Sequence, residues 1–142
     1  GYRKAPLTKK GILHPKRILE LARRMIDAFR IDTPTPYTHA KFLSGGNVQK
    51  IILSREIDAC RGLLVAAYPS RGLDVGATEY VRNQMIEQSE SGKAVLLISE
   101  DLEELMTVAD SIAVLYEGRI MGILTCKDAD TEKLGMMMAG IE

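Results

Sequence analysis

The sequence predicts an α/β fold with parallel strands. Two short apolar runs, residues 63–67 (LLVAA) and 94–98 (AVLLI), lack polar alternation, which is typical of strands buried on both faces of a parallel sheet. A helix expected over residues 75–89 lies between them, so strand, helix and strand would form one crossover unit. The length of 142 residues, with 46% hydrophobic and 27% charged residues, fits an ordinary globular domain.

The first third of the chain predicts a helix over residues 15–30. Pro15 suits the first turn of a helix, and Ile18, Ala22, Met25 and Phe29 recur at spacings of three and four. This apolar stripe predicts packing against the core. Residues 1–13 are expected to be irregular, and the Thr-Pro-Thr-Pro run at 33–36 predicts a loop after the helix.

Residues 43–50 (LSGGNVQK) predict a loop that becomes a helix, running from Asn47 to about Cys60. Ser44 is a good N-cap, and Gly45 and Gly46 have no Cβ, so a bulky group can approach the backbone closely. The orphan N–H groups and the positive dipole end of the helix favour an anion such as a phosphate. A plain capped helix start explains the same residues, so both interpretations remain open from the local pattern.

The last third predicts a helix, a hairpin and a final helix. Ser99 can cap a helix with an apolar stripe at Leu102, Leu105, Met106 and Ala109. The runs 112–116 and 119–124 flank Glu117-Gly118, a typical hairpin turn. The last helix is expected over residues 131–138, with its three methionines as core filler.

Composition excludes several classes of function. Lys+Arg and Asp+Glu are both 19, and a net charge of zero argues against non-specific nucleic-acid binding. Cys60 and Cys126 stand in no metal-binding spacing and suggest a reducing compartment. No apolar run approaches the length of a membrane span, and no signal peptide is recognisable.

The motif LSGGNVQK followed by IILSREI resembles the signature motif of ABC-type ATPases, in the form found in sugar and nucleoside importers. The stretches RGLDVGA (71–77) and IAVLYEGRIMG (112–122) extend this resemblance along the chain. It implies a partial P-loop NTPase (RecA-like) core with parallel strands, a helical signature subdomain and a C-terminal hairpin. Residues 1–62 would be the helical segment, and residues 63–142 the C-terminal part of the ATPase core.

The Walker A loop and strand of that family are absent from this sequence. The nearest fragment, Ser91-Gly92-Lys93-Ala94, has Glu87 where a P-loop has its first glycine, and Ala94 offers no hydroxyl for magnesium. The resemblance therefore implies a fragment, the C-terminal part of the second ATP-binding domain of a longer protein.

The resemblance also assigns the site residues. Nucleotide contacts would come from the signature motif and the D-loop, at Ser44, Gly45, Gly46, Asn47 and Asp74. In that family the serine and glycines contact the γ-phosphate of an ATP held mainly by the opposite domain. Asp74 also suits a plain helix cap, so its role stays open.

The hydrolytic positions of the family are degenerate here. Ala67 and Tyr68 occupy the Walker B aspartate and glutamate positions, and Glu100 occupies the switch histidine position. An alanine methyl cannot bind magnesium, a phenol is a poor base at pH 7, and a carboxylate repels a γ-phosphate. We therefore expect no catalytic residue and no metal ligand in this fragment. The alternative is that Tyr68 and Glu100 are merely a sheet-end aromatic and a helix-start acid.

The function implied is that of an ATP-binding subunit fragment from an importer of nucleosides or simple sugars. ATP and Mg²⁺ are expected in the full-length dimer and not in the isolated fragment, which should not hydrolyse ATP. The expected partners are a second ATP-binding domain, an integral membrane permease and an extracytoplasmic solute-binding lipoprotein, at the cytoplasmic face of the plasma membrane. The alternatives are a non-catalytic regulatory module with the same fold and, less favoured by the motifs, a soluble ABC protein of DNA repair or iron–sulfur assembly.

The absent Walker A strand has a structural consequence. It would lie between the strand at 94–98 and the strand at 112–116, so the latter is left across a gap. Because exposed strand edges recruit other strands, we expect either a collapsed sheet or a strand-exchanged homodimer.

Overall fold

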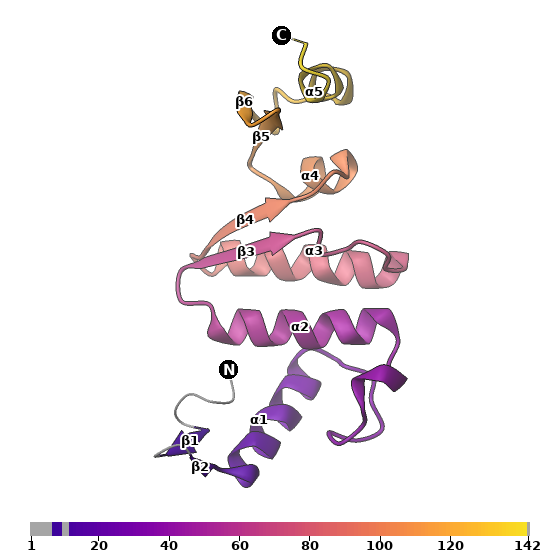
Figure 1. Ribbon diagram of the computed structural model, residues 1–142, viewed down its shortest axis with the longest axis vertical. Helices are drawn as coiled ribbons and strands as arrows, with labels where there is room; N and C mark the ends of the chain where they lie inside the picture. Colours follow the sequence, from indigo (N-terminus) through magenta and orange to yellow (C-terminus); the bar gives the residue numbers. More distant parts are fainter. Residues whose placement is uncertain (1–6, 10–11, 142) are drawn as a thin grey trace.

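The computed structural model describes residues 7–9 and 12–141. Figure 1 shows the chain running from the N-terminal helices at the bottom, through a parallel strand pair, to a C-terminal hairpin and helix at the top. The N-terminal part begins with a small antiparallel pair, β1 (Thr8–Lys9) and β2 (Ile12–Leu13). The expectation of an irregular start is therefore wrong for residues 8–9 and 12–13, and residues 1–6, 10 and 11 lie outside the described part.

Helix α1 (Pro15–Ala28) starts at its proline, as predicted, and ends two residues early. None of its side chains is fully buried. The stripe that includes Ile18, Ala22 and Met25 is only half-buried, so the prediction of core packing is wrong for this chain. The helix contacts only a small part of α2 (Gly45–Ala59), which begins after the short 3₁₀ helix η1 (Ala40–Phe42).

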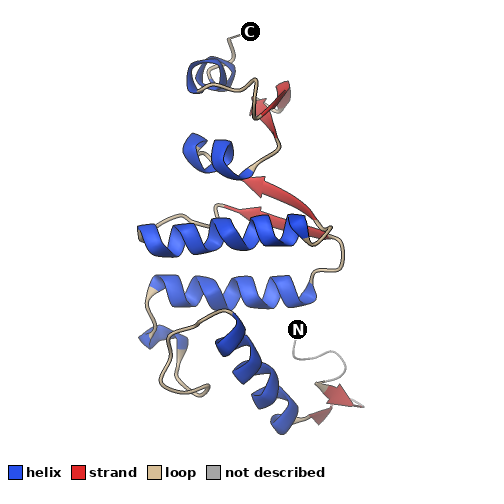
Figure 2. Cartoon of the chain, turned by 180° about the vertical axis from the view of Figure 1, so that it is seen from behind, coloured by secondary structure: helices blue, strands red, loops and turns tan. Residues whose placement is uncertain are grey.

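The parallel pair at the centre is confirmed. β3 (Leu63–Ala67) and β4 (Ala94–Ile98) pair in register, and α3 (Val75–Glu90) connects them, as Figure 2 shows from the opposite side. Helix α3 packs on one face of the pair and α2 packs on α3. The buried cluster here consists of Leu53, Ala66, Val81 and Met85, of which Val81 and Met85 are each only 1% exposed.

The other face of this strand pair is open. Leu63, Val65, Leu96 and Ile98 point away from α3 and are 43–58% exposed. The prediction that both faces are buried is therefore wrong for this chain, although the apolar composition that prompted it is real.

Helix α4 (Leu102–Val108) follows β4 and is capped by a residue that the sequence pattern did not select. The side chain of Asp101 accepts a hydrogen bond from the Glu104 amide at 3.1 Å, whereas Ser99 accepts one from the Asp101 amide. Asp101 is thus the N-cap and the choice of Ser99 is wrong. An aspartate next to the first turn can accept hydrogen bonds from the unpaired N–H groups of that turn, and its negative charge is stabilised by the helix dipole.

The C-terminal hairpin and helix agree with the prediction. β5 (Ser111–Tyr116) and β6 (Arg119–Thr125) are antiparallel, and α5 (Thr131–Met138) covers them. A second buried cluster forms from Ile112, Val114, Leu134 and Met137. Of the three methionines, Met137 fills this core, while Met136 and Met138 are each 43% exposed.

The strands do not merge into one sheet. Within the described residues β1–β2, β3–β4 and β5–β6 are separate two-stranded sheets, and a short segment with α4 lies between β4 and β5. The expected collapse of the sheet is therefore wrong for the single chain, and exchange between two copies stays a prediction. None of the described helices is both long enough and apolar enough to cross a membrane.

The hairpin turn allows a stability prediction. Glu117 and Gly118 both have positive φ, 44° and 78°, which is the backbone of a type I′ turn. Asparagine tolerates this conformation better than glutamate, so Glu117→Asn should stabilise the chain by roughly 1 kcal/mol. The midpoint of urea unfolding measures this, with Gly118→Ala as the opposite control because a Cβ is disfavoured there. An unchanged or lower midpoint for Glu117→Asn would contradict the assignment.

Candidate functional site

The loop at residues 43–47, named here the signature loop, is built around the hydroxyl of Ser44. Its Oγ accepts hydrogen bonds from the Asn47 amide at 3.3 Å and from Asn47 Nδ2 at 3.0 Å. This confirms Ser44 as the N-cap of α2. The hydroxyl proton of Ser44 is still available for donation, since both of these bonds use the oxygen as acceptor.

The side chain of Asn47 holds the loop in place. Besides donating to Ser44, its Oδ1 accepts a hydrogen bond from the Asp32 amide at 2.8 Å. The side-chain amide of Asn47 thus ties the start of α2 to the segment that directly follows α1. In this arrangement Asn47 shapes the signature loop, because both polar atoms of its side chain already form hydrogen bonds within the chain.

The two glycines lie at the tip of α2, where helix geometry leaves the first N–H groups without intrahelical partners. A Cβ on Gly45 would meet nothing within 4 Å, so this position opens to solvent. A Cβ on Gly46 would lie 3.0 Å from the Cβ of Ala77, which is at the start of α3. Glycine at 46 therefore allows the N-terminal ends of α2 and α3 to approach closely, side by side in Figure 1.

Asp74 belongs to the same end of the molecule. Its Oδ1 accepts a hydrogen bond from the Ala77 amide at 2.8 Å and caps α3. The structure therefore brings Asp74 near the signature loop through the Gly46–Ala77 contact. Asp74 is exposed and lies beside the two helix tips.

Ala67, Tyr68 and Glu100 lie together at the carboxyl end of the β3–β4 pair. Ala67 pairs with Ile98, and the Tyr68 amide continues the ladder by donating to the Ile98 carbonyl at 2.8 Å. Glu100 follows two residues later and is exposed. The chain thus has a methyl group, a phenol and a carboxyl group at this edge.

The backbone of Tyr68 is in an unusual conformation. Its φ is 49°, in the left-handed region that bulky residues rarely adopt, and the residue is 45% exposed. The guanidinium of Arg71 lies 5.8 Å from the centre of the ring. Outliers of this kind cluster at functional sites, where the surrounding structure holds them. No pattern in the sequence predicts this strain, because it lies in the backbone conformation alone.

The tip of α2 and the carboxyl end of β3–β4 differ in the ligands that they could bind. Orphan amides and a serine hydroxyl at the tip of α2 fit a phosphate, which needs donors. Ala67 and Tyr68 do not fit Mg²⁺, because that ion prefers carboxylate and phosphate oxygens. Across residues 7–9 and 12–141, no group of three or more His, Cys, Asp or Glu side chains could hold a metal ion.

Three residues that sequence reasoning missed connect these segments. Gln49 Nε2 donates to the carbonyl of Pro69 at 2.7 Å, and Ser70 Oγ donates to Glu104 Oε1 at 2.5 Å. Gln49 is part of the motif that was singled out, but nothing in its spacing shows a partner twenty residues away. Glu104 looks like an ordinary surface acid in the sequence, yet it is fully buried.

Behind the signature loop, Tyr80 of α3 contacts α2. The ammonium of Lys50 lies 4.7 Å from the centre of its ring and donates to the Arg30 carbonyl at 3.1 Å. The phenol oxygen is buried and has no hydrogen-bond partner among the described residues. Burial, helped by the negative charge of Glu87, raises the pKa of Tyr80 above 10.0, while Arg30 acts in the opposite direction.

Comparison with proteins of known sequence confirms the resemblance to import ATP-binding proteins. The chain is 49% identical over 140 residues to the guanosine import ATP-binding protein NupO of Bacillus subtilis and 42% identical to the nucleoside import ATP-binding protein NupA of Lactococcus lactis. It is 36% identical to the ribose import ATP-binding protein RbsA of Bacillus subtilis. These matches cover 92–99% of this chain but only 27–28% of the relatives. No protein-family model matches the chain.

Solved structures confirm the fold. The chain superposes on a dimeric ATP-binding cassette, MJ0796 with ADP and Pi, with a TM-score of 0.69 and 18% identity, covering 83% of this chain and 51% of the cassette. The ATP-binding subunit of another ABC transporter gives a TM-score of 0.69 at 20% identity, with coverages of 89% and 56%. The α/β fold is therefore that of about half an ABC-type ATPase domain, and residues 1–62 and 63–142 as separate segments stay a prediction.

The cap of α2 can be tested by stability. Ser44→Ala removes the acceptor of the Asn47 amide and should destabilise the chain by about 1 kcal/mol, whereas Ser44→Gly should cost only about a few tenths of that. Urea unfolding of the three proteins measures the difference. If the alanine and glycine variants lost the same stability, the hydroxyl would not be the cap.

The buried phenol predicts a pH dependence. Because the pKa of Tyr80 is raised in the folded state, its contribution to stability is complete below about pH 10 and is lost as the pH rises through the folded-state value. Tyr80→Phe should therefore lose less stability than the wild type between pH 9 and about pH 11, measured by urea unfolding. Tyr37→Phe is the matched control, because Tyr37 is 76% exposed. Equal pH dependence of all three proteins would contradict the prediction.

Proposed function

We propose that this chain is the C-terminal part of the second ATP-binding domain of an ABC importer for nucleosides or simple sugars. The observation that carries the proposal is the signature loop: a serine-capped helix tip with two glycines, in a chain similar along nearly its whole length to import ATP-binding proteins. The guanosine import relative is 49% identical to this chain, a glucose import relative is 44% identical and the nucleoside relative is 42% identical, so the proposal includes both classes of solute.

In this proposal the signature loop serves an ATP that a partner domain holds. The amides of Gly45 and Gly46 and the Ser44 hydroxyl donate hydrogen bonds to the γ-phosphate, and the dipole of α2 favours its negative charge. Asn47 keeps the loop in shape through Ser44 and the Asp32 amide. Asp74 stands beside the loop at the start of α3, where it can contact the partner.

The chain's own nucleotide site would turn over slowly. Ala67 and Tyr68 supply neither a magnesium ligand nor a strong base, and loss of a general base typically lowers a rate about a hundredfold to ten-thousandfold. The Glu100 carboxyl group adds like-charge repulsion to a γ-phosphate. One competent and one degenerate site would therefore share the work of the dimer unequally, and the isolated chain would not hydrolyse ATP.

The open apolar face of β3–β4 supports the view that this chain is part of a larger domain. Leu63, Val65, Leu96 and Ile98 lie exposed on it, as residues of a parallel sheet rarely do. The superposed cassettes are about twice as long as the part that this chain matches. We infer that the remaining part of the domain, with the Walker A loop, covers this face.

The partners follow from the proposed role. A second ATP-binding domain would complete each nucleotide site, and an integral membrane permease would use the closure of the pair. An extracytoplasmic solute-binding lipoprotein would deliver the solute. The chain would lie at the cytoplasmic face of the plasma membrane as a peripheral subunit, and ATP with Mg²⁺ would be used by the complete dimer.

The role of the signature loop can be tested in the complete transporter. Ser44→Arg places a long side chain at the helix tip and removes a donor to the γ-phosphate. ATP hydrolysis by the purified complex should fall by about a hundredfold or more. The control is Ser89→Arg, which adds the same side chain at the exposed end of α3. Near-normal hydrolysis by Ser44→Arg would rule out the proposal.

A further inference from the structure

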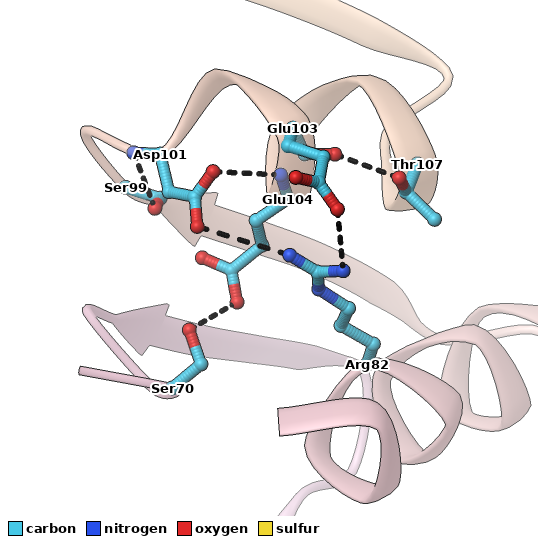
Figure 3. A network of polar contacts seen from close by, with 7 residues as sticks. All are labelled: Ser70, Arg82, Ser99, Asp101, Glu103, Glu104 and Thr107. Carbon is cyan, nitrogen blue, oxygen red and sulfur yellow. Dashed lines mark hydrogen bonds and ion pairs between the residues drawn. The ribbon is translucent and has the colours of Figure 1, made fainter. Parts of the chain in front are cut away.

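Glu104 is an unusual residue because its side chain is buried completely without an opposite charge. Its exposed fraction is 0%, and its Oε1 accepts a hydrogen bond from Ser70 Oγ at 2.5 Å (Figure 3). Its Oε2 has no hydrogen-bond partner within the described part of the chain. Glutamate is almost never fully buried unless it is paired, so the burial of Glu104 calls for a structural explanation.

The charged side chain near Glu104 forms its ion pairs with other residues. Arg82 of α3 lies in the same layer, but it pairs with Asp101 at 3.8 Å and with Glu103 at 3.7 Å. The Glu104 amide is held by the cap at Asp101. Figure 3 shows Arg82 reaching the flanking carboxylates, while the carboxyl group of Glu104 points towards Ser70. The hydrogen bond to Ser70 is therefore the contact that gives the buried side chain its direction.

Ser70 lies in the loop between β3 and α3, and a second contact holds the preceding residue. Gln49 of α2 donates to the Pro69 carbonyl at 2.7 Å. Residues 69 and 70 are thus held from two sides, by the helix of the signature loop and by α4. The loop ends at Asp74, which caps α3.

We propose that Glu104 is a positioning residue that fixes the loop at 69–74 to α4. Through Gln49 the same loop is tied to α2. These hydrogen bonds connect the signature loop, Asp74 and the segment that carries Glu100. A shift of α4 would therefore move the loop between β3 and α3. This role rests on the proposed function. If the signature loop contacts the ATP of the partner domain, these connected segments couple that ATP to Tyr68 and Glu100 at the carboxyl end of β3–β4.

Hydrogen exchange of the complete ATP-binding protein tests this role without reference to ATP. The Arg71 amide donates to the Tyr68 carbonyl and the Leu73 amide to the Ser70 carbonyl, so both report on the loop. Ser70→Ala should speed exchange of these two amides about tenfold, because the loop loses its tie to α4. Ser91→Ala is the matched control, since it removes a serine hydrogen bond to Gln88 at the other end of α3.

Two conservative variants distinguish positioning from simple packing. Ser70→Thr keeps the hydroxyl, and Glu104→Gln keeps an acceptor at the Oε1 position, so both should stay within about twofold of the wild type. Unchanged exchange in Ser70→Ala, or a rise spread evenly over the chain, would overturn the proposal. Exchange in Glu104→Gln as fast as in Ser70→Ala would also overturn it, because the hydrogen bond from Ser70 would then not be what holds the loop.

Kinetics of the complete transporter provide the second readout. Ser70→Ala should lower kcat for ATP hydrolysis by about tenfold with little change in KM, because it disturbs geometry and removes no nucleotide contact. A change confined to KM would overturn the role. If Ser44→Arg left hydrolysis intact, the proposed function would fail, yet the exchange result at Arg71 and Leu73 would still decide whether Glu104 holds the loop.

Discussion

The in-register pairing of β3 with β4 fixes where the candidate site residues lie. Ala67 opposite Ile98 puts Tyr68 and Glu100 at one edge, and the loop that leaves this edge leads to Asp74 and α3. Helix α3 then covers one face of the pair, and α2 packs against α3. The position of the signature loop therefore depends on a pair of short apolar strands that carries no phosphate-binding residue itself.

Local signals in the sequence predicted most of this architecture. The apolar runs of β3 and β4, the cap at Ser44 and the Glu117-Gly118 turn act over a few residues, and each appears where it was expected. The failures have another origin. Burial of both faces of β3–β4 and core packing of α1 need surfaces beyond the described chain, and periodicity cannot tell whether such a surface is present.

The candidate site was predictable to the same extent. The motifs indicated Ser44 and Asp74 as helix caps, and the structure shows both caps at neighbouring helix tips, whereas their contact with a nucleotide stays a prediction. Three features were not predictable, because each depends on a tertiary contact. They are the hydrogen bonds of the Asn47 side-chain amide within the chain, the left-handed backbone of Tyr68 and the burial of Glu104. The residues that shape the site are thus harder to see in the sequence than those that would touch a ligand.

The two buried clusters share no fully buried residue. One joins α2, β3 and α3, the other joins β5, β6 and α5, and α4 contributes half-buried residues to each, Val108 to the first and Leu105 to the second. A chain arranged in this way has two cooperative units connected by one short helix. Chemical denaturation should then proceed in two steps, and a substitution in α2 or α3 would shift the midpoint of the first unit, whereas one in the hairpin would shift that of the second.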